Sequence, residues 1–406
     1  MKKAPHLSAS IIAFLGALLA AGLFVVYASQ FEKKYIHSIA QLDFHAVLKG
    51  QVLQRLAFKQ KDLLVLYGSS EVVLVPSDYE AYKFFRNYPT GFMVFTVANK
   101  GTSMLSMAQD LAALGPDMRG KKFVISFAPA TATMGPGGAM NADNYDPNFS
   151  ELHALELAFS PYIKWETKGR AAKRMLDYPN TLAERPFLKF TLQALADGST
   201  LGRIKYILAW PLGRLQIAII NVQDHYAVWD FTRHQSTEKL KVTRKEETID
   251  WQADLATAEQ QQIKRSDTNT FGVDNDRWLR GQELMQNLPA PGSKDARFVE
   301  NVQKALDWND MDILLTIVKE LDGRPLLLGR PMNVGLWEAL GYSEDAQNTY
   351  YQMLHQTADS YGYPIVDFRQ YGRDKYFSVD MASHSSPKGW MYINEVLDNF
   401  YHDRNP

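Results

Sequence analysis

Short continuous apolar runs recur along the chain, at residues 63–67, 92–97, 123–127, 325–328 and 364–367. A run of this kind is typical of a parallel strand that is buried on both faces. Stretches with helical character separate the runs, and the clearest lie at residues 103–114, 343–361 and 388–401. Strands that alternate with helices predict an α/β fold, in which helices cover both faces of a parallel sheet.

The middle of the chain, residues 141–320, does not follow this alternation. It contains a helix-prone stretch at 165–175, an apolar stretch at 204–220 and a polar, charged span at 233–264. No internal repeat or low-complexity tract is present in it. We therefore predict a large, mostly helical insertion between the third and the fourth strand of the sheet.

The N-terminal segment contains an uncharged apolar run at residues 7–29. At a rise of ~1.5 Å per residue, a helix of this length spans the ~30 Å hydrocarbon core of a bilayer. Residues 26–28 offer a weak cleavage site for a signal peptide, but the run exceeds the roughly 7–15 apolar residues of such a peptide. We expect an uncleaved anchor in the cell membrane at 1–29, a helical stalk at 30–61 and a domain at 62–406.

The orientation of the anchor follows from the size of the domain behind it. Lysines flank the apolar run on both sides, so the positive-inside rule decides little. A long domain translocates largely regardless of such charges. We expect a single-pass protein with a cytoplasmic N-terminus and an extracytoplasmic domain.

The amino-acid composition of the chain argues against several classes of function. The chain has 406 residues, a formal net charge of -1 and no cysteine. Without a basic excess, binding to nucleic acid is disfavoured. Without cysteine, the chain has no disulfide framework, no thiol nucleophile and no cysteine-bound metal. The spacing of Asp224, His225, Asp230 and His234 fits no metal site, so we expect neither a metal nor a cofactor.

The first apolar run ends in the turn Gly68-Ser69-Ser70. In doubly wound sheets ligands bind outside the carboxyl ends of the strands, so a serine there lies at the mouth of a crevice. The N-terminus of the following helix can help to stabilise an oxyanion. On its own, the turn is better explained as a glycine turn whose serines cap the next helix, because Gly-Ser-Ser is common.

A second motif lies near the C-terminus, where Asp380 precedes His384 by four residues in a loop after the last apolar run. A serine hydroxyl becomes a good nucleophile only when a base takes its proton, and histidine, with an ordinary pKa of about 6.5, suits that role. An aspartate on the other ring nitrogen fixes the tautomer. Alone, this motif is better explained as a surface histidine in a polar loop. Together with Ser70, it predicts a serine acyl-transfer site.

This chain order, with serine after the first strand and Asp and His before the last helix, resembles that of SGNH (GDSL-like) hydrolases and acyltransferases. Further pieces narrow the resemblance to the DltD family, the membrane-anchored D-alanyl transfer proteins of teichoic-acid D-alanylation systems. They extend over nearly the whole chain: the N-terminal apolar helix, LLVLYGSSEVV from residue 63, Asn99-Lys100-Gly101, RPMNVGLWEALGYS at 330–343, YGYPIVDF at 361–368, and His384 followed by Lys388-Gly389-Trp390.

The resemblance implies roles for individual residues. Ser70 becomes the nucleophile and His384 the base, while the backbone N–H groups of Gly101 and Ser70 become oxyanion donors. Ser69 and Asn333 are grouped with the binding residues, although Asn333 also suits a turn. The family's usual spacing is Asp-x-x-His, and here Asp380 and His384 are one residue further apart. We expect a bulge in the loop to bring the carboxylate to the ring.

A second departure lies after the third strand. The family usually has Ser-Pro-Gln-Trp-Phe there, whereas this chain has Ala-Pro-Ala-Thr-Ala at 128–132. The missing polar and aromatic residues affect the surface expected to meet the acceptor or the carrier. A different donor or acceptor is one explanation.

For function, the resemblance implies that Ser70 accepts a D-alanyl group and passes it to a hydroxyl of an envelope polymer. The partners it implies are a membrane O-acyltransferase, a D-alanyl carrier protein, and lipoteichoic acid or another envelope polysaccharide. Two alternatives remain open. One is an esterase or thioesterase that uses water as the acceptor. The other is a non-catalytic scaffold for the acyltransferase and the carrier protein.

Overall fold

At the centre of the molecule is one sheet of five parallel strands, in the order β2-β1-β3-β4-β5. The computed structural model describes residues 5–40, 50–73, 75, 77–88, 90–133, 142–236, 248–281 and 288–405. The strands are β1 Leu63–Gly68, β2 Met93–Ala98, β3 Lys122–Phe127, β4 Arg324–Gly329 and β5 Ile365–Asp367. Each begins and ends within one residue of a predicted run, so the predicted α/β fold is confirmed.

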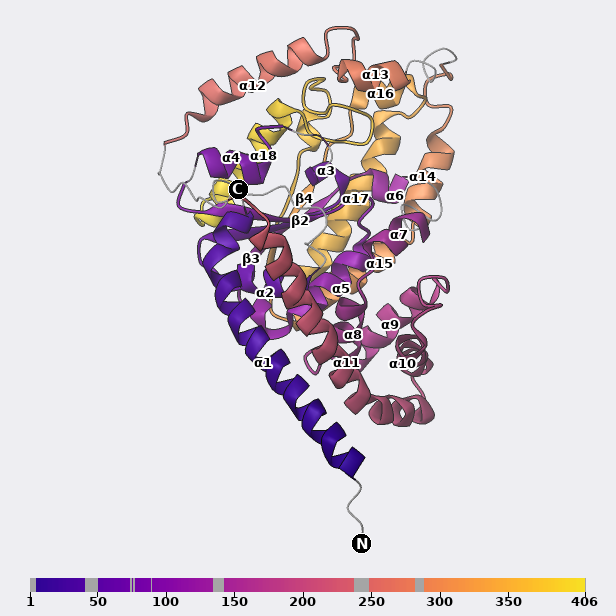
Figure 1. Cartoon of the computed structure of the whole chain (residues 1–406). Coiled ribbons are helices and arrows are strands. Elements are labelled where there is room, and N and C mark those ends of the chain that lie inside the picture. Colours follow the sequence, from indigo (N-terminus) through magenta and orange to yellow (C-terminus); the bar gives the residue numbers. More distant parts are fainter. Residues whose placement is uncertain are drawn as a thin grey trace.

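The strands are apolar throughout because both faces of the sheet are covered. In β1, Val65 and Tyr67 point into one hydrophobic core, and Leu64 and Leu66 point into the other. The larger core lies under α2 Gln51–Lys59, α5 Met104–Leu114, α15 Asp307–Glu320 and α17 Glu344–Tyr361. The smaller core lies under α4 Ala81–Asn87 and α18 Pro387–Tyr401 (Figure 1).

In its described part, the segment between β3 and β4 is helical and contains no strand. Besides α15, its described helices are α6 Ala130–Thr133, α7 Ala142–Asn148, α8 Glu151–Phe159, α9 Trp165–Leu176, α10 Pro186–Asp197, α11 Thr200–Arg233, α12 Trp251–Arg265, α13 Asn275–Gly281 and α14 Asp295–Lys304. α8 packs on α5 beneath the sheet, whereas α12 packs on α18 at the other end of the molecule (Figure 1).

The N-terminal helix α1, Pro5–Ala40, is long and apolar enough to cross a membrane, and its most apolar window is not buried by the rest of the protein. From Phe24 onward the helix contacts the body, and α11 runs beside it. The ring of Phe24 packs edge-on against Trp229, and Nδ1 of His225 lies 2.7 Å from Glu32 Oε1. Within the expected stalk, α2 packs on β1 and belongs to the body.

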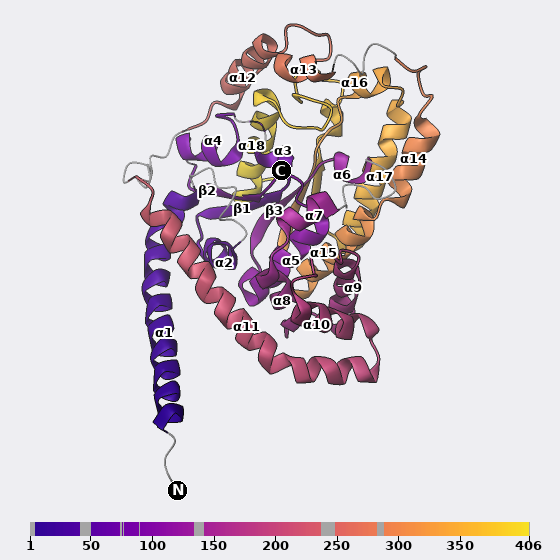
Figure 2. The ribbon, with the colours of Figure 1, turned by 45° about the vertical axis from the view of Figure 1, so that its right-hand side comes forward.

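The two ends of the molecule differ in what they contain. Figures 1 and 2 show the free end of α1 and the first part of α11 at one end, and α12, α13 and α16 Val334–Ala339 at the other. The strands run away from the free end of α1, so α3 Ser70–Val73, which follows β1, lies in the far half. The carboxyl edge of the sheet therefore faces away from the apolar end of α1.

Candidate active site at the carboxyl edge of the sheet

The strand order places a topological switch point between β1 and β3, because the chain continues from β1 to one side of the sheet and then returns to the other. Open α/β sheets bind their ligands in the crevice at such a point, outside the carboxyl ends of the strands. Ser69 and Ser70 follow β1 directly, and Ser70, half-buried, begins α3. The predicted nucleophile therefore lies where this fold offers a binding crevice.

Local contacts shape the serine turn. Glu71 Oε1 accepts a hydrogen bond from the backbone N–H of Ser69 at 3.0 Å, which folds the carboxylate back over Gly68. A Cβ at Gly68 would lie 2.7 Å from that oxygen and 2.3 Å from a methyl group of Val72, so only glycine fits. Ser69 Oγ donates to the carbonyl oxygen of Asn99 at 3.4 Å. The side chain of Ser69 thus joins the turn to the loop after β2.

The Asp380 carboxylate and the His384 imidazole form a close pair. Nδ1 of His384 lies 2.7 and 2.9 Å from the two carboxylate oxygens, and Oδ1 also accepts the backbone N–H of Ala382 at 3.0 Å. Burial alone would raise the pKa of Asp380, but the hydrogen bond and charge of His384, together with an ion pair to Arg277, outweigh it and lower that pKa. Asp380 is therefore ionised at neutral pH.

The extra residue between Asp380 and His384 is absorbed by a tight loop. The backbone N–H of Val379 donates to the carbonyl oxygen of His384 at 2.9 Å, which closes four residues between them. Within this loop Ser383 has φ +65°, a left-handed conformation that costs a non-glycine residue of order 1 kcal/mol or more. The loop thus contains the expected bulge and brings the carboxylate to the ring despite the longer spacing.

Like Nε2 of His153, the second ring nitrogen of His384 is available for a further hydrogen bond. Nε2 is buried and has no hydrogen-bond partner in the described part of the chain. Since Nδ1 faces a carboxylate, the proton of the neutral ring belongs on Nδ1 and Nε2 keeps its lone pair. Unpaired buried polar atoms are uncommon, and a base awaiting a proton is one physical reason for such an atom.

Arg330 connects the two halves of the site, and the sequence analysis did not single it out. Its side chain is fully buried at the end of β4, where Nε donates to Ser126 Oγ at 3.0 Å and Nη1 donates to Ser385 Oγ at 2.8 Å. Burial lowers the pKa of Arg330 to about 10, against the opposing effect of the negative charge on Glu71. Arg330 thus interacts with the residues next to Ser70 and next to His384.

A signal for this arginine does exist in the sequence. Arg330 is a charged residue that follows the buried run 325–328 after Gly329, and it opens the RPMN motif. In parallel sheets a polar residue at such a position lies at the ligand-binding edge.

The remaining predicted residues have clear local roles. Gly101 lies in the turn after β2 with φ +73°, and a Cβ there would lie 2.7 Å from Asn144 Oδ1, so the position requires glycine. Asn333 caps α16, since its Oδ1 accepts the N–H of Leu336 at 3.1 Å and its Nδ2 donates to the carbonyl oxygen of Phe271 at 2.8 Å. Both polar groups of Asn333 are thus used within the protein.

The other polar cluster considered in the sequence lies far from this edge. Asp224 accepts the backbone N–H of Val52 at 2.9 Å and His225 pairs with Glu32, so the two residues attach α11 to α2 and α1. Across the described ranges, no three His, Asp or Glu side chains gather as metal ligands would.

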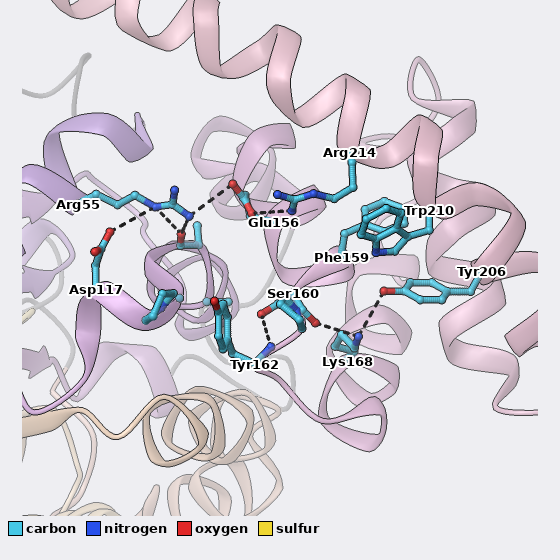
Figure 3. Close-up of a pocket in the computed structure, with 15 residues that line it drawn as sticks. Arg55, Asp117, Glu156, Phe159, Ser160, Tyr162, Lys168, Tyr206, Trp210 and Arg214 are labelled. Carbon is cyan, nitrogen blue, oxygen red and sulfur yellow. Dashed lines mark hydrogen bonds and ion pairs between the residues drawn. The ribbon is translucent and has the colours of Figure 1, made fainter. Parts of the chain in front are cut away.

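A cavity of about 500 Å³ lies at the opposite edge of the sheet (Figure 3). Its walls come from α2, α8, α9, α11 and the segment that precedes β3, and include Arg55, Asp117, Glu156, Lys168 and Trp210. This cavity and the Asp380–His384 pair therefore lie in different parts of the molecule. We locate the candidate site by chemistry, because the Asp380–His384 pair and the serine turn lie at the carboxyl edge.

Fold and site together define a class: a doubly wound α/β protein with an apolar N-terminal helix, a serine turn after its first strand and a buried Asp–His pair at the same edge. The model of one protein family, described as DltD protein, matches residues 44–402. The chain therefore belongs to the DltD family. It is 24% identical over 356 residues to Protein DltD of Bacillus subtilis (strain 168), an alignment that covers 88% of this chain and 86% of that protein.

Proposed function

We propose that the protein is a membrane-anchored serine acyltransferase of D-alanylation, acting on teichoic acid or a similar envelope polymer through an acyl-serine intermediate. Membership of the DltD family supports the process. The chemistry rests on one observation: His384 binds Asp380 through Nδ1 and leaves a buried Nε2 without a partner among the described residues. That arrangement suits a general base for a serine hydroxyl.

In the proposed first step, Ser70 Oγ forms a bond to the carbonyl carbon of an activated D-alanyl ester or thioester, and its proton passes to His384 Nε2. The tetrahedral intermediate collapses as the bond to the leaving group breaks, and that group takes the proton from Nε2. Asp380 stabilises the transient imidazolium. The product is D-alanyl-Ser70.

In the second step a hydroxyl group of the acceptor attacks the acyl carbon. Its proton passes to Nε2 and then to Ser70 Oγ, which leaves with both electrons of the acyl bond. The backbone N–H groups of Ser70 and Gly101 are the proposed donors to the oxyanion. Each such donor contributes about 3 kcal/mol of transition-state stabilisation in comparable enzymes.

The proposed location is the cell membrane, with α1 as an uncleaved single-pass anchor and a cytoplasmic N-terminus. The helix continues without a break from Pro5 to Ala40, and Ala28, next to the weak cleavage site, is fully buried against the body. The candidate site faces away from the apolar end of α1 (Figure 2). An acceptor polymer that extends outward from the bilayer suits this geometry.

The proposed partners follow from the same chemistry. Ser70 needs an activated D-alanyl donor, which we assign to a membrane O-acyltransferase supplied by a D-alanyl carrier protein. The hydroxyl acceptor is lipoteichoic acid or another envelope polysaccharide.

Mass spectrometry of the intact protein after brief exposure to a small D-alanyl thioester tests the proposal directly. The expected result is one D-alanyl adduct that peptide mapping places on Ser70. Ser70→Ala removes the adduct, and Ser360→Ala, at an exposed serine on α17, is the matched control that keeps it. An adduct on Ser69, or none on any serine, contradicts the proposed nucleophile.

Adding an acceptor separates the candidate outcomes. Transfer of the adduct to added lipoteichoic acid identifies a transferase, and loss of the adduct to water at the same rate with and without acceptor identifies an esterase or thioesterase. Normal D-alanylation in cells that express stable Ser70→Ala protein would instead identify a scaffold.

A further inference from the structure

Helix α11 carries a stripe of large aliphatic side chains that the protein does not cover. Six of them, Leu201, Ile204, Leu208, Leu212, Leu215 and Ile219, are each at least half exposed. Their spacing of three or four residues places all six on one side of the helix. Soluble proteins rarely expose a continuous apolar surface of this kind, which usually marks contact with a membrane or another protein.

Another side of the same helix packs closely against α8 and α10. Helix α11 is therefore fixed to the body on that side, and its other side is uncovered. Gly202, Ala209, Gly213 and Ile217 are buried. A Cβ at Gly213 would lie 2.2 Å from the ring of Phe159 on α8, and one at Gly202 would lie 2.6 Å from the carbonyl oxygen of Ala194 on α10. The helix therefore cannot rotate to bury the aliphatic stripe without losing its contacts with α8 and α10.

The charge of this segment has a single sign. Between residues 200 and 223 the chain contains Arg203, Lys205 and Arg214 and no Asp or Glu, although the whole chain has a net charge of -1. Arg214 faces Glu156 at 3.6 Å and Arg203 stacks on the ring of Trp165. Basic side chains beside an apolar face are typical of helices that lie in the headgroup region of anionic membranes.

The uncovered side lies on the same helix that packs against α1. α1 and α11 pack together through Phe24, Tyr226 and Trp229, and α1 exposes its own large apolar side chains along the part that precedes this contact. Pro211 lies inside α11, and Figure 2 shows the first part of the helix running across the molecule and the second part rising toward α1. Both exposed apolar surfaces thus lie at one end of the molecule.

We propose that the first two-thirds of α11, residues 200–220, contacts the lipid bilayer beside α1 as a second membrane contact, with its aliphatic stripe among the acyl chains and its basic residues at anionic headgroups. This inference rests on the proposed anchoring by α1. Two contacts would fix the tilt of the body and hold the carboxyl edge of the sheet at a set distance from the membrane.

The absence of cysteine from the chain allows a clean test, because one introduced cysteine takes a fluorescent label at one site. The full chain is reconstituted into bilayers of phosphatidylcholine and phosphatidylglycerol, labelled with NBD at Leu208→Cys, and quenched by acyl-chain nitroxide lipids or by aqueous iodide. Leu279→Cys on α13, a similarly exposed leucine at the other end, is the matched control. Leu18→Cys in α1 reports on the anchor.

We expect the Leu208→Cys label to be quenched by nitroxide lipids as the Leu18→Cys label is, and by iodide several-fold less than the Leu279→Cys label. Iodide quenching equal to that at Leu279→Cys, with Leu18→Cys still protected, overturns this inference and leaves the anchor intact. Protection from both quenchers also overturns it, in favour of contact with a second copy of the chain. If the Leu18→Cys label itself reaches iodide, the proposed anchoring fails and this inference fails with it.

Discussion

The two ends of this molecule depart in opposite ways from the usual pattern, in which apolar side chains are buried and polar side chains are exposed. At the carboxyl edge of the sheet, the polar or charged residues Arg330 and His384 are buried and Asp380 is largely buried. At the other end, the aliphatic stripe on α11 is exposed. Buried charges and exposed apolar patches are the informative exceptions in a globular protein. The comparison teaches that each end has to be stabilised by something different.

At the carboxyl edge the protein itself supplies the stabilisation. Arg277 and His384 surround the carboxylate of Asp380, and two serine hydroxyls accept from Arg330. Such networks stabilise only when nearly every member has a partner, because an unpaired buried polar group costs about 1–3 kcal/mol. At the α11 end no protein group covers the stripe in the described structure, and the compensation we propose comes from lipid.

The largest expected effect is at the carboxyl edge. His384→Ala removes the general base, and we expect acyl transfer to fall by at least about 10³-fold. His234→Ala, at an exposed histidine after α11, is the matched control and keeps full activity. The rate of adduct formation on Ser70 is the measurement. A loss of less than tenfold would show that His384 is not the base.

Asp380→Asn keeps the shape of the carboxylate and removes its charge. We expect acyl transfer to fall about 10²- to 10⁴-fold, because the neutral amide no longer favours the required ring tautomer. The rate of adduct formation is compared with that of the wild type. A rate near the wild-type value would mean that Arg277, rather than the imidazole, is the relevant partner of Asp380.

The same variant gives a pH test of stability. The pKa of Asp380 is lowered in the folded protein, so its ionised form stabilises the fold above the ordinary pKa of about 4, and that contribution disappears as pH falls through the lowered value. We expect wild type to exceed Asp380→Asn in free energy of unfolding at pH 7, and the difference to shrink toward acid pH. Denaturant titrations at several pH values measure it. A constant difference would argue against an ionised Asp380.

Variants of Arg330 separate positioning from direct catalysis within the site. We propose that Arg330 positions the loop that carries His384. Arg330→Met removes both hydrogen bonds, and we expect kcat to fall by roughly 10- to 100-fold with little change in KM. Arg330→Met also leaves Ser126 Oγ and Ser385 Oγ without their donor, so the free energy of unfolding of the variant is measured beside kcat. Arg330→Lys, which keeps the charge without the two-pronged geometry, should rescue poorly. A loss as large as that of His384→Ala would indicate direct contact with the reacting groups.

The smallest expected effect is at the α11 end. Gly213→Ala forces a Cβ against the ring of Phe159, and we expect the free energy of unfolding in detergent to fall by about 1–3 kcal/mol. Gly335→Ala in α16 has nothing closer than 4.0 Å and should be neutral or slightly stabilising. Thermal unfolding of both variants provides the comparison. Equal behaviour would show that α11 is not firmly seated.

Much of the fold could be predicted because the signals were local. A strand buried on both faces needs apolar residues at every position, so runs such as 63–67 and 123–127 identify β1 and β3 without knowledge of their neighbours. The apolar stretch 204–220 was likewise visible within the predicted helical insertion. Its periodicity did not reveal which face would pack on Phe159 and which would stay open, since that depends on α8 and α10.

The candidate site could be predicted from local sequence signals only in part. Ser70, His384 and Asp380 could be named from residue type and chain order, but the contact between Asp380 and His384 depends on a loop closed by backbone hydrogen bonds and on the left-handed Ser383. Arg330 was not recognised, because its partners Ser126 and Ser385 lie 204 and 55 residues away in the sequence.

By itself, the sequence determined the strands, the helical insertion, the apolar N-terminal helix and the residue types available for chemistry, because each depends on neighbours within a few turns of the chain. Only the tertiary structure decided which polar groups share the carboxyl edge, and which face of α11 is left without cover. Both depend on contacts between segments far apart in sequence, where packing and desolvation act on the assembled fold rather than on any local pattern.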